Sequence, residues 1–162
     1  MERVSHPIPP LYNEASKVLV LGSFPSVKSR EGQFFYHHPQ NRFWKVISTI
    51  FDEPLPHTIE EKRNLLLHNN IAVWDVIQSC EIVGSADSSI KNVIANDLSG
   101  ILNVANISQI ITNGRTSGQL YMKHIFPQTK IEALCLPSTS PANASCSMDC
   151  LVKEWSVLRD FI

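Results

Sequence analysis

Long apolar runs and strong net charge are both missing from this sequence. No stretch approaches the roughly 18 consecutive apolar residues that a membrane-spanning helix needs. The first residues lack the charged and apolar regions of a secretory signal. The formal net charge is −1, so the protein as a whole carries no basic field, and any contact with nucleic acid must come from a local patch. We therefore expect a cytoplasmic protein with no membrane partner.

Glycine-rich phosphate motifs are missing too. The first apolar run ends in GSFPS at residues 22–26, which fits neither GxGxxG nor GxxxxGK followed by Ser or Thr. GxSxG is also absent, and Ser23 lacks the second glycine that a nucleophile elbow requires. These absences argue against dinucleotide-binding, P-loop and α/β-hydrolase chemistry.

The four cysteines form no CxxC pair. Cys146 and Cys150 are four residues apart in a segment whose pattern predicts a helix, which would place them one turn from each other. A metal site there would need two more ligands, and no histidine lies nearby in the sequence. We therefore expect buried or inert thiols and no metal or cofactor, with a metal-binding pair as the alternative.

Short apolar runs alternate with amphipathic stretches along the whole chain. Four runs predict strands, at residues 17–22, 71–74, 109–112 and 131–136. Apolar residues at helical spacing predict helices at residues 41–50, 59–67, 98–105 and 147–161. A chain of 162 residues is the size of one domain. We therefore predict a single α/β domain over residues 1–162, built on a mostly parallel sheet.

Polar and turn-forming residues follow each predicted strand, at residues 22–25, at Asp75, at residues 113–115 and at residues 137–141. Ligand sites in parallel α/β sheets collect at the carboxyl ends of the strands, so we expect these four segments to face one crevice. Purely structural explanations also exist, since Asp75 could bind local backbone and Asn41 could cap the helix that follows it. His37 and His38 fit a structural role at least as well as a catalytic one.

Four segments together resemble the uracil-DNA glycosylase superfamily: LGSFPS at residues 21–26, HPQNRFWKVI at 38–47, IAVWDV at 71–76 and LPSTSPAN at 136–143. The second segment is similar to the mismatch-specific uracil-DNA glycosylases, and the whole set is most similar to the hypoxanthine-DNA glycosylase branch. The resemblance covers roughly residues 17–160. It implies a three-layer α/β/α fold with a central, mostly parallel four-stranded sheet. It also implies a monomeric DNA glycosylase of base excision repair that flips out a deaminated base, with hypoxanthine as the first choice of substrate. Uracil or xanthine as the substrate, and a non-catalytic binder of damaged DNA or nucleotides, are the alternatives.

The resemblance assigns catalysis to Asn41. In related enzymes the loop after the first strand contains an asparagine that holds the attacking water, but Phe24 stands at that position here. The asparagine of HPQN, Asn41, is the implied replacement. An amide suits this task without ionising, because its carbonyl can accept from water while its NH2 group anchors elsewhere. No lysine is placed as an amine nucleophile, so we predict a monofunctional hydrolase.

Base and DNA contacts follow from the same resemblance. The implied base-binding residues are Gly22, Ser23, Phe24, Tyr36 and Asp75, with Phe24 and Tyr36 as stacking surfaces. Asp75 would accept from a base N–H but repel an anionic leaving group. The implied DNA contacts follow the last two strands: Asn113, Arg115, Ser138, Thr139, Ser140, Pro141, Ala142 and Asn143. Hydroxyls and backbone donors of this set would bind phosphate, and residues 141–143 would form a wedge in the minor groove.

Overall fold

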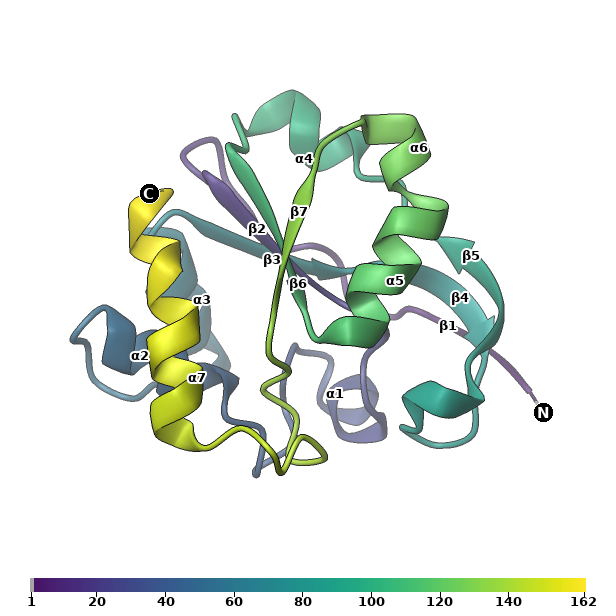
Figure 1. Ribbon diagram of the computed structural model, residues 1–162, viewed down its shortest axis with the longest axis horizontal. Helices are drawn as coiled ribbons and strands as arrows, with labels where there is room; N and C mark the ends of the chain where they lie inside the picture. The colour runs from purple at the N-terminus through teal and green to yellow at the C-terminus, as the bar shows by residue number, and fades with distance from the viewer. Residues whose placement is uncertain (1) are drawn as a thin grey trace.

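A parallel four-stranded sheet lies at the centre of the computed structural model, which describes residues 2–162 (Figure 1). Its strands are β2 (Val18–Gly22), β3 (Ile71–Asp75), β6 (Gln109–Asn113) and β7 (Ala133–Leu136), in the order β3-β2-β6-β7. All three neighbouring pairs are parallel. The predicted four-stranded parallel sheet is therefore confirmed.

Strand β2 shows why this sheet needs cover on both faces. All five of its residues are buried, and its side chains alternate between two apolar clusters. Val18 and Val20 belong to one cluster, and Leu19 and Leu21 to the other. A continuous apolar run of this kind is typical of a strand that is buried between two layers of helices.

Helices supply those two layers. α2 (Phe43–Ile50), α3 (Ile59–His68) and α7 (Met148–Trp155) pack on the face that carries Val18 and Val20. α4 (Ser99–Val104), α5 (Arg115–His124) and the short α6 (Phe126–Thr129) pack on the opposite face. Figure 1 shows α2, α3 and α7 to the left of the sheet and α5 and α6 to its right. The predicted three-layer α/β/α architecture is confirmed.

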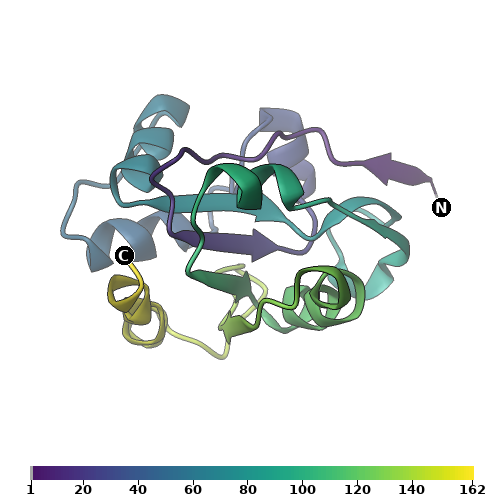
Figure 2. The same cartoon turned by 90° about the horizontal axis from the view of Figure 1, so that it is seen from above.

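A second, antiparallel sheet, which no pattern in the sequence indicated, extends the molecule on one side. Its strands are β1 (Arg3–Ser5), β4 (Ile77–Glu81) and β5 (Lys91–Ala95), in the order β1-β4-β5. Its register pairs Ser5 with Ser79, which brings the residues after β1 close to the end of β3. Figures 1 and 2 both show β1 near one end of the molecule and the C-terminus at the other.

The predicted helices are present, with small changes in their bounds. α3 begins at a capping box formed by Thr58 and Glu61, and the predicted helix at 147–161 divides into α7 and a 3₁₀ segment, η2 (Ser156–Asp160). α1 (Val27–Gly32), α5 and α6 were not predicted. Within residues 2–162, no helix combines the length and the apolar character that crossing a membrane would require.

Candidate functional site

A cavity of about 570 Å³ opens at the carboxyl edge of the central sheet. The loops after β2 and β7 meet there, at the lower edge of the molecule in Figure 1. All four predicted segments contribute to its wall. Of the predicted site residues, the cavity wall contains Asn41, Gly22, Ser23, Phe24, Tyr36, Asp75, Asn113, Ser138, Thr139, Ser140, Pro141 and Ala142, and it leaves out Arg115 and Asn143.

The Asn41 side chain is held in one orientation just before α2. Its Oδ1 accepts from the backbone N–H of Phe43 and from the hydroxyl of Thr139, both at 2.9 Å. Because a backbone N–H can only donate, the Asn41 atom that faces it must be the oxygen. The NH2 group has no hydrogen-bond partner among the residues that the structure describes, so it is the group that Asn41 can offer to the cavity. The carbonyl oxygen, which is expected from the sequence to accept from the water, already accepts from two protein donors here, so that contact remains a prediction.

Thr139 links Asn41 to the end of β6. Its hydroxyl accepts from Asn113 Nδ2 at 3.0 Å and donates to Asn41, while its backbone N–H donates to Asn113 Oδ1 at 3.0 Å. Thr139 is fully buried. Thr139 uses its hydroxyl and its backbone N–H in these bonds, whereas Asn113 keeps one amide hydrogen free for another acceptor. Their contact with phosphate remains a prediction. The two residues fix the orientation of Asn41.

The two predicted stacking residues, Phe24 and Tyr36, are both partly enclosed. Phe24 keeps 8% of its surface exposed, and the Arg30 guanidinium lies 5.5 Å from its ring centroid. The Tyr36 ring stacks on Phe43 with the centroids 4.2 Å apart, so that face is closed to a base. The Tyr36 hydroxyl is buried without a partner within residues 2–162. Burial and, to a lesser extent, the Asp75 carboxylate raise the pKa of Tyr36, which the Asn113 side chain partly opposes.

Asp75 is bonded to a histidine that sequence reasoning missed. His6 Nε2 lies 2.7 Å from Asp75 Oδ2, and both side chains are almost fully buried. His6 directly follows β1, and the pairing of β1 with β4 carries it to a partner 69 residues away. Gly22 completes this group, because a Cβ at that position would collide with Asp75 Oδ1 and lie 3.3 Å from Tyr36 Oη. No local sequence pattern identifies such a pair.

The connection between β4 and β5 forms a wall of the cavity that was also missed. Residues 85–88 line it, including the start of η1 (Asp87–Ser89). Ser23 Oγ donates to Asp87 Oδ1 at 3.0 Å. Desolvation by the cavity wall raises the pKa of Asp87, and the Asp75 carboxylate raises it further. The hydrogen bond from Ser23 lowers it in part.

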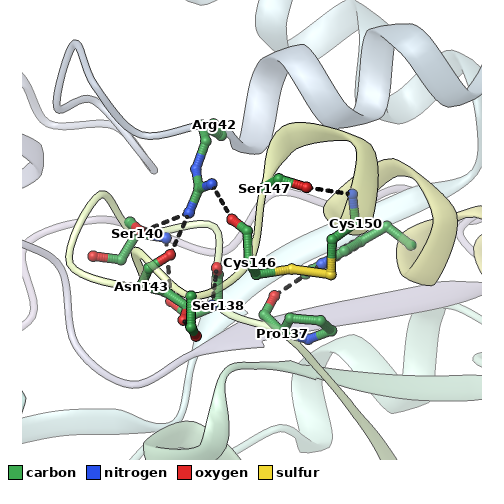
Figure 3. Close-up of a disulfide and its surroundings, with 10 residues drawn as sticks. Arg42, Pro137, Ser138, Ser140, Asn143, Cys146, Ser147 and Cys150 are labelled. Atoms are coloured by element: carbon green, nitrogen blue, oxygen red, sulfur yellow. Dashed lines mark hydrogen bonds between the residues drawn. A yellow bond between two sulfur atoms is a disulfide. The ribbon is translucent and has the colours of Figure 1, made fainter.

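Arg42 shapes the loop that follows β7. Its guanidinium donates to the backbone carbonyls of Ser140 at 3.1 Å, Asn143 at 3.0 Å and Cys146 at 2.5 Å (Figure 3). Asn143 turns inward and donates to the Ser138 carbonyl at 3.0 Å, which explains why it does not line the cavity. At the tip of the loop, residues 141 and 142 are exposed, where the predicted wedge would stand. Arg115 lies elsewhere, in a groove between α5 and β7.

Cys146 and Cys150 form a disulfide beside this loop, with their Cα atoms 5.6 Å apart (Figure 3). The expectation of inert thiols is wrong for this pair, whereas Cys80 and Cys135 are free. Ser147 is the N-cap of α7, which agrees with the predicted start of the helix at residue 147. Cys146 therefore precedes the helix, and its side chain turns back toward Cys150. Residues 2–162 contain no group of three or more His, Cys, Asp or Glu side chains that could hold a metal ion.

The family model of the Uracil DNA glycosylase superfamily matches residues 9–159. The chain belongs to this superfamily. It is 34% identical over 154 residues to a protein of Methanosarcina acetivorans named hypoxanthine DNA glycosylase, covering 93% of this chain and 94% of the relative. A protein of the same name from Methanosarcina barkeri is 32% identical over 137 residues, covering 83% and 85%. A solution NMR structure from Methanosarcina acetivorans, described as a uracil DNA glycosylase, matches with a TM-score of 0.82 at 31% identity, covering 97% and 98%.

Membership of the superfamily confirms the predicted family and the prediction of a DNA glycosylase, whose substrate is DNA. The match to the NMR structure confirms the predicted fold. The roles of individual site residues remain predictions, for which the bonds around Asn41, Asp75 and Arg42 supply the geometry.

Proposed function

We propose that this protein is a monofunctional DNA glycosylase that acts as a monomer and removes hypoxanthine from DNA. Two relatives that carry the name hypoxanthine DNA glycosylase support the choice of base, since they are similar over most of this chain. The observation that carries the proposed mechanism is the fixed amide of Asn41, whose oxygen is held by Phe43 and Thr139 and whose NH2 group is left for the cavity.

Hydrolysis of the N-glycosidic bond passes through an oxocarbenium-like sugar and releases an anionic base. Water adds to C1′ of the sugar, the base leaves with the electron pair of the bond, and the proton that the added water loses neutralises the released base. A catalyst must therefore hold that water on one face of the sugar before the bond breaks. The NH2 group of Asn41 donates to one lone pair of the water and leaves the other to attack. Because the amide is fixed by two donors, little reorganisation is needed in the transition state.

The rest of the cavity wall provides binding groups. The exposed part of Phe24 offers an apolar surface to a flipped base, and Ser23 and Asp75 lie at its polar end. Ser138 and Ser140 stand on the loop that reaches DNA, and the exposed residues 141 and 142 form the wedge. Arg42 supports that wedge from behind, since its guanidinium holds three carbonyls of the loop.

Asn41→Ala tests the catalytic role. We expect the wild type to release hypoxanthine from a duplex that contains one deoxyinosine, and the variant to do so about 10²- to 10³-fold more slowly. Affinity for the duplex should stay within a few fold, because the water contact matters chiefly in the transition state. Single-turnover rates and DNA binding measure the two quantities separately. Asn103→Ala, which changes an exposed asparagine of α4, is the matched control, and an unaltered rate in Asn41→Ala would remove Asn41 from catalysis.

Phe24 favours a second candidate, because it stands where relatives carry a water-holding asparagine. A protein without that group could bind damaged DNA or nucleotides on the same fold without cutting it. Duplexes that contain hypoxanthine, uracil or xanthine separate the candidates. Release of uracil or xanthine but not hypoxanthine would change the substrate, and release of no base by the wild type would favour the binding protein.

A further inference from the structure

Three polar side chains gather at one end of the cavity: Asp75, His6 and Tyr36. Asp75 and Tyr36 line the cavity, whereas His6 does not and is bonded to one oxygen of Asp75, Oδ2. The hydrolysis mechanism above uses neither His6 nor the Tyr36 hydroxyl. Both groups are nonetheless buried, and buried polar groups without a catalytic or structural use are uncommon.

The hydrogen-bond directions around His6 can be assigned. The backbone N–H of Ile8 donates to His6 Nδ1 at 3.2 Å, so Nδ1 carries a lone pair and the proton of the neutral ring is on Nε2. Nε2–H therefore donates to Asp75 Oδ2. The other oxygen, Oδ1, has no hydrogen-bond partner among the described residues and lies beside Gly22. Asp75 thus presents a fixed, acceptor-only oxygen.

His6 itself has little freedom to move away. Its backbone N–H donates to the Gln78 carbonyl at 2.7 Å. Its ring meets Phe24 and Trp74 edge-on, with centroids 6.0 and 6.1 Å apart. The second sheet therefore holds the imidazole, and the imidazole holds the carboxylate.

Tyr36 supplies the complementary group. Its hydroxyl lies beside Gly22, on the same side as Asp75 Oδ1, and has no partner within residues 2–162. Burial keeps the phenol protonated, so its O–H is a free donor. Asp75 Oδ1 then stands as an acceptor at the polar end of the cavity, and the Tyr36 donor is buried in the wall beside it.

We propose that His6 is a positioning residue which, by fixing Asp75 as an acceptor beside the Tyr36 donor, makes the site selective for the N–H and C=O edge of a deaminated base. The proposal rests on the proposed glycosylase function. Hypoxanthine carries N1–H next to C6=O, whereas adenine carries a bare N1 next to an amino group. Asp75 Oδ1 accepts from N1–H, and the C6=O end of the base lies toward the unpartnered Tyr36 O–H, which is buried in the wall beside Asp75. Adenine would set its N1 lone pair against the carboxylate and its amino group against the O–H.

Binding to DNA that cannot be cut isolates this effect from catalysis. The probes are duplexes with one 2′-fluoro nucleotide, which resists cleavage, bearing hypoxanthine, adenine, or unsubstituted purine, which lacks both O6 and N1–H. We expect the wild type to bind the hypoxanthine duplex about 10- to 100-fold more tightly than the purine duplex, as one or two buried bonds to a charged acceptor would give. His6→Phe should bring this ratio to about one, and His6→Gln, which restores a donor near Nε2, should recover most of it. His57→Gln changes an exposed histidine outside the cavity and is the control.

A merely structural role for His6 predicts a different pattern. His6→Phe would then weaken binding of the hypoxanthine and purine duplexes equally, and that result would overturn the proposal. A wild type without preference between the two duplexes would overturn it as well. Failure of the proposed function would look different. The wild type would release no base from an ordinary deoxyinosine duplex but would still prefer the hypoxanthine duplex in binding.

Asp75→Asn gives an independent measurement that does not require His6 to be replaced. With His6 in place, the amide oxygen of the new side chain accepts from Nε2–H, so its NH2 group faces the cavity and matches N1 of adenine. We expect the ratio of the affinity for the hypoxanthine duplex to that for the adenine duplex to fall at least tenfold. In His6→Phe/Asp75→Asn the amide is free to turn, and part of the preference for hypoxanthine should return. An unchanged preference in Asp75→Asn would contradict the proposed acceptor, even if His6→Phe failed to fold.

Discussion

At the scale of single residues, Thr139 decides whether the Asn41 amide keeps its orientation. Its hydroxyl receives one hydrogen bond from Asn113 and gives one to Asn41, although the residue itself touches no solvent. A group of this kind acts on catalysis through its neighbour, and its effect is expected in the rate and not in the affinity for DNA.

Thr139→Val keeps the shape of the side chain and removes the hydroxyl. We expect the single-turnover rate of base release to fall about 10- to 100-fold, because Asn41 loses one of two donors and can rotate. The free energy of unfolding should fall by about 1–2 kcal/mol, since Asn113 loses a buried acceptor. Urea unfolding and single-turnover kinetics measure the two effects. Thr49→Val, whose hydroxyl bonds only to the Lys45 carbonyl of its own helix, is the control, and a loss of stability with an unchanged rate would show that Thr139 is structural only.

Site residues that stand in a recognisable local motif could be predicted from the sequence. Those that reach the site only through the pairing of distant strands could not. Asn41 stands in a short recognisable segment before a helix, and Asp75 follows a buried strand. His6 carries no such signal, because its role depends on the register between β1 and β4. The orientation of the Asn41 amide was likewise out of reach, since it depends on a bond from Thr139 that spans 98 residues.

At the scale of elements, the loop after β7 is held at two points: by Arg42 from α2 and by the disulfide at the start of α7. The two supports meet at Cys146, whose carbonyl accepts from Arg42 and whose sulfur is bonded to Cys150. A change in the thiol state should therefore reach the part of the loop that approaches DNA.

Cys150→Ser, or reduction with dithiothreitol, tests this connection. We expect the free energy of unfolding to fall by about 1–2 kcal/mol, because the closed loop is short. Affinity for duplex DNA should fall several fold as the loop loosens. Chemical unfolding and DNA binding under oxidising and reducing conditions measure both effects, and Cys135→Ser, which changes a free thiol, is the control. Equal DNA affinity in both thiol states would contradict the proposed connection.

Elements were predictable where their own pattern was strong. β2 is a continuous apolar run that must be buried on both faces, and α2 has six buried residues in eight. α5 was missed because only two of its residues, Ser117 and Tyr121, are buried. β1 has three residues, too few for a periodic pattern, so the sheet that carries His6 could not be expected.

At the scale of the whole molecule, two carboxyl groups have pKa values that folding shifts in opposite directions. Their contributions to the free energy of unfolding therefore change with pH in opposite directions. Burial raises the pKa of Asp87 from 3.8, whereas the backbone and side-chain bonds of Ser99 lower the pKa of Asp97. Folding therefore disfavours the ionised form of Asp87 and favours that of Asp97. The contribution of Asp87 is present below its unfolded pKa and is lost as the pH rises. That of Asp97 is present at neutral pH and is lost as the pH falls.

Asp87→Asn should accordingly raise the melting temperature at pH 7. The gain in the free energy of unfolding should be no more than about 1 kcal/mol, because Asp87 keeps contact with solvent although the cavity wall partly desolvates its carboxyl group. The gain should vanish near pH 3. Asp97→Asn should show the reverse sign, with a loss at pH 7 that disappears in acid. Calorimetry from pH 3 to pH 7 measures both variants, and parallel curves for the two would contradict the assigned shifts.

The packing of α7 against α2 has a consequence for the newly made protein. Phe43 at the start of α2 meets Trp155 at the end of α7 edge-on at 6.0 Å, and the Trp155 indole donates to the Pro137 carbonyl at 2.9 Å. The contact between Phe43 and Trp155 joins the first third of the chain to its last residues, so it can form only after the C-terminal segment has been made. During synthesis on the ribosome, the Asn41 segment emerges long before its partners. An incomplete chain therefore has no ordered active site, and we expect nascent or C-terminally shortened chains to leave DNA uncut.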